Sequence, residues 1–279
     1  MSTLAVTLDG SSLSQTALPH ALARLRDGDT LVLIRVASSP ADERSAREHL
    51  EQVAASYTER AHDVTTVVRT GPAVQEILKV LESCEADLLV TASHGHSGWQ
   101  RARLGSVAEE VTRRSPCPVW LVREDHRAAS GLGTVVVALD GTAHGETALE
   151  FVREWLPVPG RLILLGATDL VTDLRTSLRS PEEARNASLQ AVKTYLEERA
   201  HWLRNLGRTC ELQVRDSTAA SAIVDVARTE TADLVVVGTH GRSGLLRWAL
   251  GSVAETVMRE SPCPVAVVSP EAVWSSRAD

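Results

Sequence analysis

Short apolar runs alternate along this chain with longer stretches in which apolar residues return every three or four positions. The runs are rich in Val, Ile and Leu, as strands buried on both faces of a sheet are. The longer stretches have the period of amphipathic helices. In the first 124 residues the predicted strands are 4–8, 31–36, 64–68, one that begins at Leu88, and 118–122. Strands that alternate with helices predict an α/β fold with a parallel sheet.

Local signals indicate where several helices begin. Pro19 lies inside the first apolar stripe and is tolerated only near a first turn, so this helix is expected to be kinked or to start late. Ser39 and Pro40 resemble a helix cap and a first helical residue, which predicts that the second helix starts here. In the second half, Ser180-Pro181-Glu182-Glu183 is a fuller start signal for a helix that is expected to end at Gly207.

The chain is an internal repeat. Residues 86–122 and 232–268 share the blocks HGxSG, LGSVAE and SPCPV in one register, 146 positions apart. Near the two beginnings the offset is 131, because Asp9 matches Asp140. The second half therefore carries 15 extra residues between its second and third strands, in the loop 169–179 and the following helix. We expect domains at 1–124 and 134–271, a linker at 125–133 and a tail at 272–279.

The repeated stretch has the features of a phosphate site. In the second half, an apolar strand at 234–237 is followed by Gly238, Gly241 and Gly251. Ser252 stands three residues before Glu255, and this pattern predicts a capping box that starts a helix. Glycines let the backbone approach a ligand, and a helix N-terminus favours an anion. The spacing, Gly-x2-Gly-x9-Gly-Ser, is neither the P-loop nor the Rossmann fingerprint.

This spacing resembles the nucleotide-binding signature of the universal stress protein (UspA) family, and the resemblance covers nearly the whole chain twice. It implies two tandem doubly wound domains, each a five-stranded parallel sheet of order 3-2-1-4-5 with helices on both faces. Many members of the family bind ATP, whereas another branch lacks the glycines and does not. Members pair through the last strand, which here implies an intramolecular pseudo-dimer of strands 119–122 and 265–268, and the chain is expected to form a homodimer.

The resemblance also assigns site residues. In the second half it places Asp140 and the backbone near Ala167 at adenine, Gly238 at ribose, and Gly241, Gly251 and Ser252 at the phosphates, where Arg242 adds charge. Mg²⁺ is expected to accompany the triphosphate rather than occupy a protein cage. The matching positions of the first half are Asp9, Val36, Ala92, Gly95, Gly105 and Ser106.

Two interpretations of these positions stay open. Asp9 and Asp140 stand where a ligand of an α/β sheet binds, but each is equally suited to capping a turn. Ala92 replaces a signature glycine, and its methyl group would crowd ribose or strain a backbone of positive φ. The second half has the full glycine set, although it departs from the first half at Gly166, which matches Arg35, and at Ser217-Thr218, which match Gly71-Pro72. We therefore rank the second half as the better nucleotide site.

Composition narrows the classes of function. The net charge of −7 argues against general binding to nucleic acid or anionic membranes. No apolar run reaches the length of a membrane span and Met1 leads directly into a strand, so we expect a cytoplasmic protein. The four cysteines form no CxxC pair and are expected to be reduced and structural.

Three functions remain. The first is a regulatory module of the stress response, in which ATP or another adenine nucleotide sets the conformation or the binding of an unknown protein partner. The second is a structural or interaction module of the same fold that binds no nucleotide, an idea that Ala92 motivates. The third is a weak ATPase. His94 and His240 each lack a neighbouring ligand or base partner, so we expect no enzyme activity and no metal site.

Overall fold

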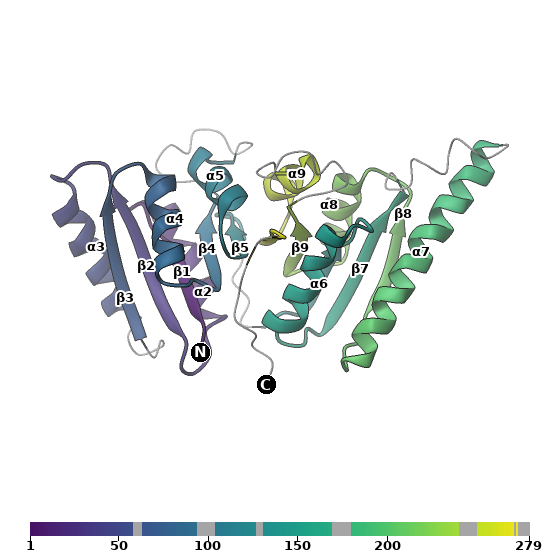
Figure 1. The fold of residues 1–279 in the computed structure, drawn as a ribbon, viewed down its shortest axis with the longest axis horizontal. Coiled ribbons are helices and arrows are strands. Elements are labelled where there is room, and N and C mark those ends of the chain that lie inside the picture. The colour runs from purple at the N-terminus through teal and green to yellow at the C-terminus, as the bar shows by residue number, and fades with distance from the viewer. Residues whose placement is uncertain are drawn as a thin grey trace. The chain divides into compact units, whose positions relative to one another are not determined.

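The computed structural model of the protein describes residues 1–57, 63–93, 104–126, 131–168, 180–239, 250–270 and 272. The chain divides into two units between residues 130 and 131. Each unit holds one copy of the repeat and has its own sheet and helices (Figure 1).

Five parallel strands form the sheet of the first half. They pair in the order β3-β2-β1-β4-β5, so that β1 and β4 lie at the centre. Leu4 of β1 stands beside Leu31 of β2 on one side and Leu88 of β4 on the other. The strands are β1 (Thr3–Thr7), β2 (Thr30–Ala37), β3 (Asp63–Thr70), β4 (Leu88–Ala92) and β5 (Val119–Val122).

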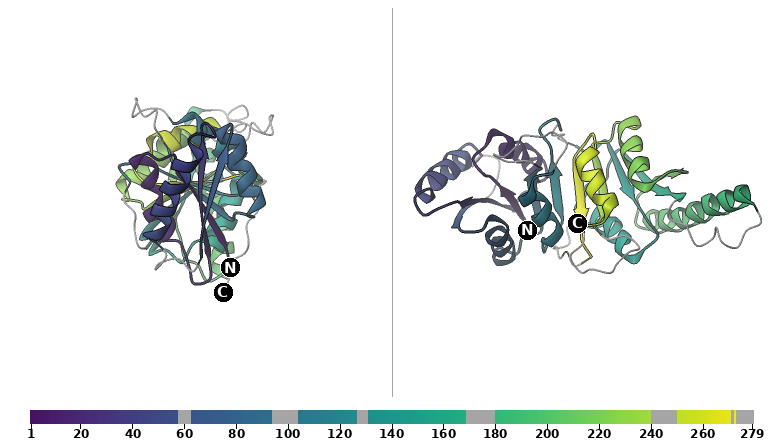
Figure 2. Two further views of the ribbon diagram at one scale, coloured as in Figure 1. Left: turned by 90° about the vertical axis from the view of Figure 1, so that its left-hand side faces the viewer. Right: turned by 90° about the horizontal axis from the view of Figure 1, so that it is seen from above.

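The helices of the first half form a layer on each face of its sheet (Figure 2). One layer consists of α1 (Ser12–Gln15), α2 (Ala17–Leu22) and α3 (Glu43–Ala55). The other consists of α4 (Ala73–Ser83) and α5 (Ser106–Arg114), which also pack on each other. This is the doubly wound arrangement, in which strand order reverses beside β1 and opens a crevice at the carboxyl edge.

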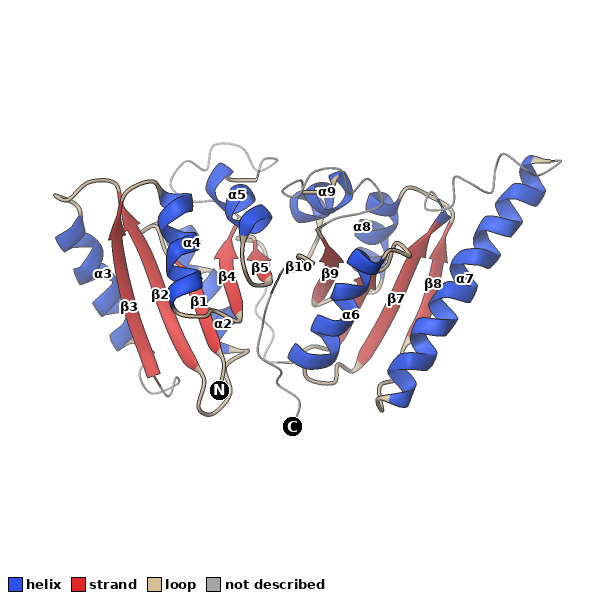
Figure 3. Ribbon diagram, viewed as in Figure 1, coloured by secondary structure: helices blue, strands red, loops and turns tan. Residues whose placement is uncertain are grey.

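The second half repeats this arrangement with the order β8-β7-β6-β9-β10, all parallel (Figure 3). Helices α6 and α7 cover one face and α8 and α9 the other. The elements are β6 (Thr134–Ala138), α6 (Ala143–Trp155), β7 (Arg161–Ala167), α7 (Pro181–Asn205), β8 (Glu211–Arg215), α8 (Ala219–Thr229), β9 (Leu234–Gly238), α9 (Ser252–Glu260) and β10 (Val265–Val268).

Burial explains why the strands read as apolar runs. Leu4, Ala5 and Val6 of β1 have no exposed surface, and neither do Val135 and Val136 of β6, because helices cover both faces of each central strand. The predicted α/β fold of two doubly wound domains is confirmed. None of the helices in the described ranges combines the length and the apolar character of a membrane span.

The helix starts confirm two predictions and correct one. The expected break near Pro19 is the junction at Thr16 between α1 and α2. Ser180 caps α7, where its Oγ accepts a hydrogen bond from the backbone N–H of Glu183 at 3.1 Å. Ser39 and Pro40 do not start α3, which begins at Glu43. Instead, Ser39 accepts a bond from the N–H of Asp42 in a preceding turn.

Part of the 15-residue insertion lengthens one helix. Helix α7 has 25 residues, whereas its counterpart α3 has 13. The helix ends before Gly207, whose φ of 75° suits glycine in a C-terminal cap. The expected longer loop, 169–179, lies outside the described residues.

Candidate functional site at the carboxyl edge

The aspartates after β1 and β6 form the same turn in both halves. Asp9 Oδ1 accepts hydrogen bonds from the N–H of Ser11 at 2.9 Å and from its hydroxyl at 2.6 Å. Asp140 Oδ1 accepts the corresponding bonds from Thr142 at 3.0 and 2.6 Å. The glycine between the two residues has a φ of 90° in the first half and 77° in the second. The role of these aspartates as turn caps is therefore confirmed.

Capping does not use the whole carboxylate in the second half. The hydrogen bonds that Asp140 accepts from described residues all reach Oδ1. Its second oxygen thus remains an acceptor for a donor such as an amine or hydroxyl of a ligand. The Asp140 carboxylate lies close to the backbone of α6, because a Cβ atom placed on Gly145 would lie 2.2 Å from Oδ1.

In each half, the residues that flank the glycine-rich segment are joined by a hydrogen bond at the carboxyl end of a strand. The N–H of Gly105 donates to the carbonyl of Ser93 at 2.8 Å, and the N–H of Gly251 donates to the carbonyl of Thr239 at the same distance. These bonds hold the starts of α5 and α9 beside the ends of β4 and β9. The predicted phosphate residues Gly95, Gly241 and Arg242 lie within the segments 94–103 and 240–249, outside the described residues.

The start of these helices differs in one detail from the predicted capping box. Helices α5 and α9 begin at Ser106 and Ser252 as predicted, but these serines are the first helical residues, and Gly105 and Gly251 occupy the cap position. Within the described ranges, no side-chain hydrogen bond caps either helix. The first-turn N–H groups therefore keep their donor capacity for an anion.

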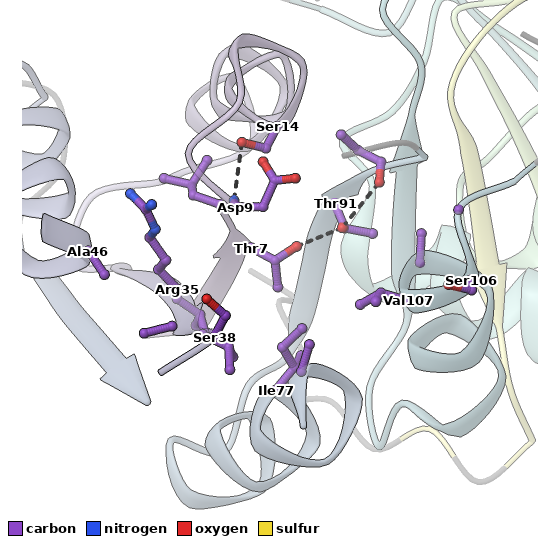
Figure 4. A pocket seen from close by; sticks show the side chains of 18 of the residues that line it. Thr7, Asp9, Ser14, Arg35, Ser38, Ala46, Ile77, Thr91, Ser106 and Val107 are labelled. Atoms are coloured by element: carbon purple, nitrogen blue, oxygen red, sulfur yellow. Dashed lines mark hydrogen bonds between the residues drawn. The ribbon is translucent and has the colours of Figure 1, made fainter. Parts of the chain in front are cut away.

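In the first half these elements enclose a cavity of about 580 Å³ (Figure 4). Five of the predicted first-half residues line it, from the Asp9 turn and the ends of β2 and β4 to the start of α5: Asp9, Val36, Ala92, Gly105 and Ser106. The size is in the range of small-molecule sites. The position, outside the carboxyl ends of central strands, is where doubly wound proteins bind ligands.

Ala92 does not close the first-half site. It lines the cavity at the end of β4, and it is not among the residues of positive φ. The strain that a positive φ would cause at Ala92 is therefore absent, since Ala92 continues the regular strand pairing with Val122 of β5. Gly238, its counterpart on β9, pairs with Val268 in the same way. Backbone conformation thus gives no reason to rank the second half above the first.

The floor of the cavity is polar, which sequence reasoning missed. The hydroxyls of Thr7 on β1 and Thr91 on β4 form a hydrogen bond of 2.6 Å (Figure 4). The repeat offsets put Ala138 and Val237 at these places in the second half. Two threonines at the ends of otherwise apolar strands are the signal that could have revealed this floor.

The end of the cavity beside β2 carries charges of both signs. Arg35, Ser38 and Asp42 line it there. Ser38 and Ser39 donate hydrogen bonds to Asp42 at 2.5 and 2.8 Å. These bonds lower the pKa of the Asp42 carboxyl and keep it ionised, and the bond from Ser38 has the larger effect.

The second half has a different edge beside β7. Thr168, which directly follows Ala167, donates to Asp216 at 2.5 Å, and Asp216 also pairs with Arg185 of α7. Further along α7, Tyr195 donates to Glu146 at 3.4 Å and Arg199 pairs with Glu146 at 3.1 Å. Helix α7 thus borders the predicted adenine end of this site.

Cysteine and metal chemistry add nothing to the edge in the described part of the chain. All four cysteines are free thiols, and burial raises the pKa of Cys117 to about 12 and of Cys263 to about 11, so neither is a reactive thiolate. Among the described residues, no group of three or more His, Cys, Asp or Glu is arranged to hold a metal ion.

Comparison with known proteins gives the family. The model of the universal stress protein family matches residues 1–123 and again 131–269. Universal stress protein Rv2005c of Mycobacterium tuberculosis is 30% identical over 190 residues, which are 66% of this chain and 62% of that protein. Universal stress protein MJ0531 of Methanocaldococcus jannaschii is 38% identical over 103 residues, 37% of this chain and 53% of that protein. The chain thus matches less than two thirds of the length of these relatives.

The fold comparison agrees over nearly the full length. The crystal structure of a universal stress protein from Archaeoglobus fulgidus superposes with a TM-score of 0.71 at 21% identity, covering 96% of this chain and 98% of that one. At this identity the likeness shows the fold. Together with the two family matches, it leads to one conclusion: the chain belongs to the universal stress protein family and carries two tandem domains of that family.

Proposed function

We propose that this tandem universal stress protein binds ATP at the carboxyl edge, and that the nucleotide controls its conformation or the binding of a protein partner in the stress response. The observation that carries the proposal is the geometry of this edge of the fold: in the first half the aspartate turn and the start of α5 border a cavity of about 580 Å³. The second half repeats both features, with Asp140 after β6 and Gly251 before α9.

The chemistry of the second-half residues fits the parts of ATP. The second oxygen of Asp140 and the backbone at Ala167 offer acceptors for the adenine amine. Gly238 borders the ribose, and the first-turn N–H groups at Gly251 and Ser252 bind phosphate oxygens. Gly241 and Arg242, from the adjoining segment, complete the proposed phosphate site.

Mg²⁺ enters this proposal as the companion of the triphosphate, neutralising its charge and being held largely by phosphate oxygens and water. We expect the chain to hold the nucleotide rather than turn it over, so that bound ATP acts as a signal. A regulatory role requires that the ATP-bound and ATP-free states differ in what they present to a partner.

The wider architecture is also a proposal. We infer a pseudo-dimer within one chain, joined through β5 and β10, and a further homodimer of two chains. The apolar strands Val119–Val122 and Val265–Val268 are each the last strand of their half, and an edge strand offers unpaired backbone groups for such a pairing. We place the protein in the cytoplasm, where its reduced thiols persist.

Retention of ATP tests the proposal. Protein freed of nucleotide is loaded with Mg·ATP, passed over a desalting column, denatured, and assayed for released ATP. We compare wild type with Gly251→Glu, whose carboxylate repels phosphate at the start of α9. The backbone there suits a side chain, since Gly251 has an ordinary φ of −65°, and an acidic residue is favourable at a helix N-terminus.

The control is Gly131→Glu, which adds the same charge where nothing lies within 4 Å of a Cβ atom. We expect wild type and Gly131→Glu to retain ATP and Gly251→Glu to lose most of it. Equal retention by all three proteins would show that the start of α9 is not the phosphate site. No retention by wild type would leave the nucleotide-free interaction module as the better hypothesis.

A further inference from the structure

The two halves carry very different residues at one matching position, residue 35 near the end of β2 and residue 166 near the end of β7. Arg35 occupies it in the first half and lines the cavity, whereas Gly166 occupies it in the second. The guanidinium of Arg35 folds back over the Asp9 turn, since a Cβ atom on Gly10 would lie 2.7 Å from Nη2 (Figure 4). The planar guanidinium of Arg35, with its five N–H donors, therefore lies where the family resemblance places the nucleotide base.

The Arg35 guanidinium has no acceptor within the described part of the chain. No hydrogen bond and no ion pair joins it to a described residue, although the cavity end also contains Asp42. The Asp42 carboxylate is instead engaged by the hydroxyls of Ser38 and Ser39. Donors that face a cavity without a protein acceptor are available to a ligand.

This end of the cavity is unsuited to an additional anionic group of a ligand. Asp9 and Asp42 bring two negative charges to it against the single positive charge of Arg35. The arrangement matches instead a neutral ring edge that presents acceptors and N–H donors side by side. Guanine has such an edge: O6 and N7 accept from an arginine in bidentate geometry, and N1–H and the 2-amine donate to a carboxylate.

The second half cannot build the same site. A Cβ atom on Gly166 would lie 2.5 Å from Cγ1 of Val192 on α7, so no side chain fits between sheet and helix there. In the first half the smaller Ala46 of α3 lines the cavity beside Arg35 (Figure 4). In the first half the strand thus carries the large residue, Arg35, and the helix the small one, Ala46. In the second half the strand carries Gly166 and the helix carries the larger Val192.

We propose that Arg35 makes the first-half cavity select a purine nucleotide with a carbonyl at C6, a guanine nucleotide, while the second half takes ATP. The phosphates of this nucleotide bind at the start of α5, at Gly105 and Ser106. Arg35 donates to O6 and N7, and Asp9 faces the donor edge of the base. This inference rests on the proposed nucleotide binding at the carboxyl edge.

The test isolates the first half by using the full chain with Gly251→Glu. Calorimetric titration with Mg·GTP, Mg·ITP and Mg·ATP compares bases that carry or lack the C6 carbonyl, since ITP shares the carbonyl but lacks the 2-amine. We expect GTP and ITP to bind at least about tenfold more tightly than ATP, the size of effect that one good bidentate pair gives.

Variants of Arg35 connect this preference to the guanidinium. In Arg35→Gly, which installs the residue of the second half, the preference over ATP should disappear mainly through weaker GTP binding. Arg35→Lys keeps the charge without the planar fork and should be intermediate. Arg35→Gln replaces Arg35→Gly if the latter unfolds. The control Arg44→Gln removes an exposed arginine of α3 that does not line the cavity, and should change nothing.

The outcomes separate the two proposals. If ATP binds the first half as tightly as GTP, and Arg35→Gly changes neither, the base assignment is overturned while nucleotide binding stands. If no nucleotide binds with Gly251→Glu present but wild type binds ATP, the first-half site is overturned alone. If wild type binds neither nucleotide, both proposals fail.

Discussion

At the scale of single residues, one aspartate in each half has a structural role beside its proposed role toward a ligand. Asp140 uses Oδ1 to hold the backbone and hydroxyl of Thr142. Thr142 in turn caps α6, where its Oγ1 accepts from the N–H of Gly145 at 3.0 Å. A turn that is held this way positions the second oxygen of Asp140 at the sheet edge.

The two roles can be separated by paired substitutions. Thr142→Val removes the helix cap and the hydroxyl bond to Asp140 but keeps the backbone bond, so it should lower the free energy of unfolding by about 1 kcal/mol and change ATP affinity far less than Asp140→Ala does. Asp140→Ala should cost a similar amount and also weaken ATP binding at least about tenfold. Urea unfolding and calorimetry measure the two effects. Equal loss of affinity in both variants would mean that Asp140 acts only through the turn.

A second residue predicts how stability depends on pH. His20 on α2 is 5% exposed. Burial lowers its pKa from 6.5 to about 4; the charge of Arg24 acts in the same direction, and a hydrogen bond with the backbone of His126 opposes the shift. The folded protein therefore keeps His20 neutral at pH values where the unfolded chain protonates it.

Stability should fall as the pH falls, because the unfolded chain binds a proton at His20 that the folded chain does not. The stability that neutral His20 confers is present above pH 6.5 and falls as the pH drops toward 4, by up to about 3 kcal/mol. His20→Gln should flatten this part of the pH profile of urea unfolding. His201→Gln, an exposed substitution on α7, should leave the profile unchanged. An unchanged slope in His20→Gln would rule out His20 as its source.

At the scale of elements, α7 sits closely on β7 because Gly166 has no side chain. Gly166→Ala places a methyl group 2.5 Å from Cγ1 of Val192, and overpacking of this kind should lower the free energy of unfolding by about 1–3 kcal/mol. Adding Val192→Ala should recover part of the loss. Gly131→Ala, which has open space around it, is the matched control. Urea denaturation of wild type, Gly166→Ala, Val192→Ala and the double variant gives the coupling; purely additive changes would contradict direct contact.

The elements also show which sequence signals are decisive. Strands were predictable because helices on both faces make each one a continuous apolar run, as at Val135 and Val136. The cap at Ser180 was predictable because Pro181 and two glutamates reinforce it. Asp42 ends the turn that Ser38 and Ser39 build, so the second helix starts later than the Ser-Pro pair indicates.

The candidate site was predictable only in part. The repeat and its glycines indicated the turn at Asp9 and the start of α5. The serine at that start was assigned as a cap, but the first helical hydrogen bond runs from the N–H of Glu109 to the carbonyl of Gly105, which puts glycine in the cap position. The bond between Thr7 and Thr91, and the fold of Arg35 over the turn, depend on how strands and helices meet, which no local pattern encodes.

At the scale of the whole molecule, the proposed pairing of β5 with β10 predicts a pattern of hydrogen exchange. Within its own half β5 pairs only with β4, so the outward amides of Val119–Val122 exchange quickly unless another strand covers them. The pairing predicts strong protection there and in Val265–Val268. The outward amides of β3, whose described partner is β2 alone, are the internal control. Fast exchange in both last strands would exclude the pseudo-dimer.

Duplication of the fold gives one chain two carboxyl edges with different chemistry. The first has a threonine floor and an arginine at the base end; the second has Gly166 and the α7 network around Asp216. If both proposals hold, a tandem protein built this way responds to two nucleotides at once. The proposed function requires only that ATP binds at the second edge.

Calorimetric titration of nucleotide-free protein with Mg·ATP tests that claim most directly. We expect about one ATP per chain, lost in Gly251→Glu and kept in Gly105→Glu, which places the same charge at the start of α5. Both glycines have a φ of −65°, so both variants should fold. Absence of binding heat in wild type, with no nucleotide retained on desalting, would contradict the claim.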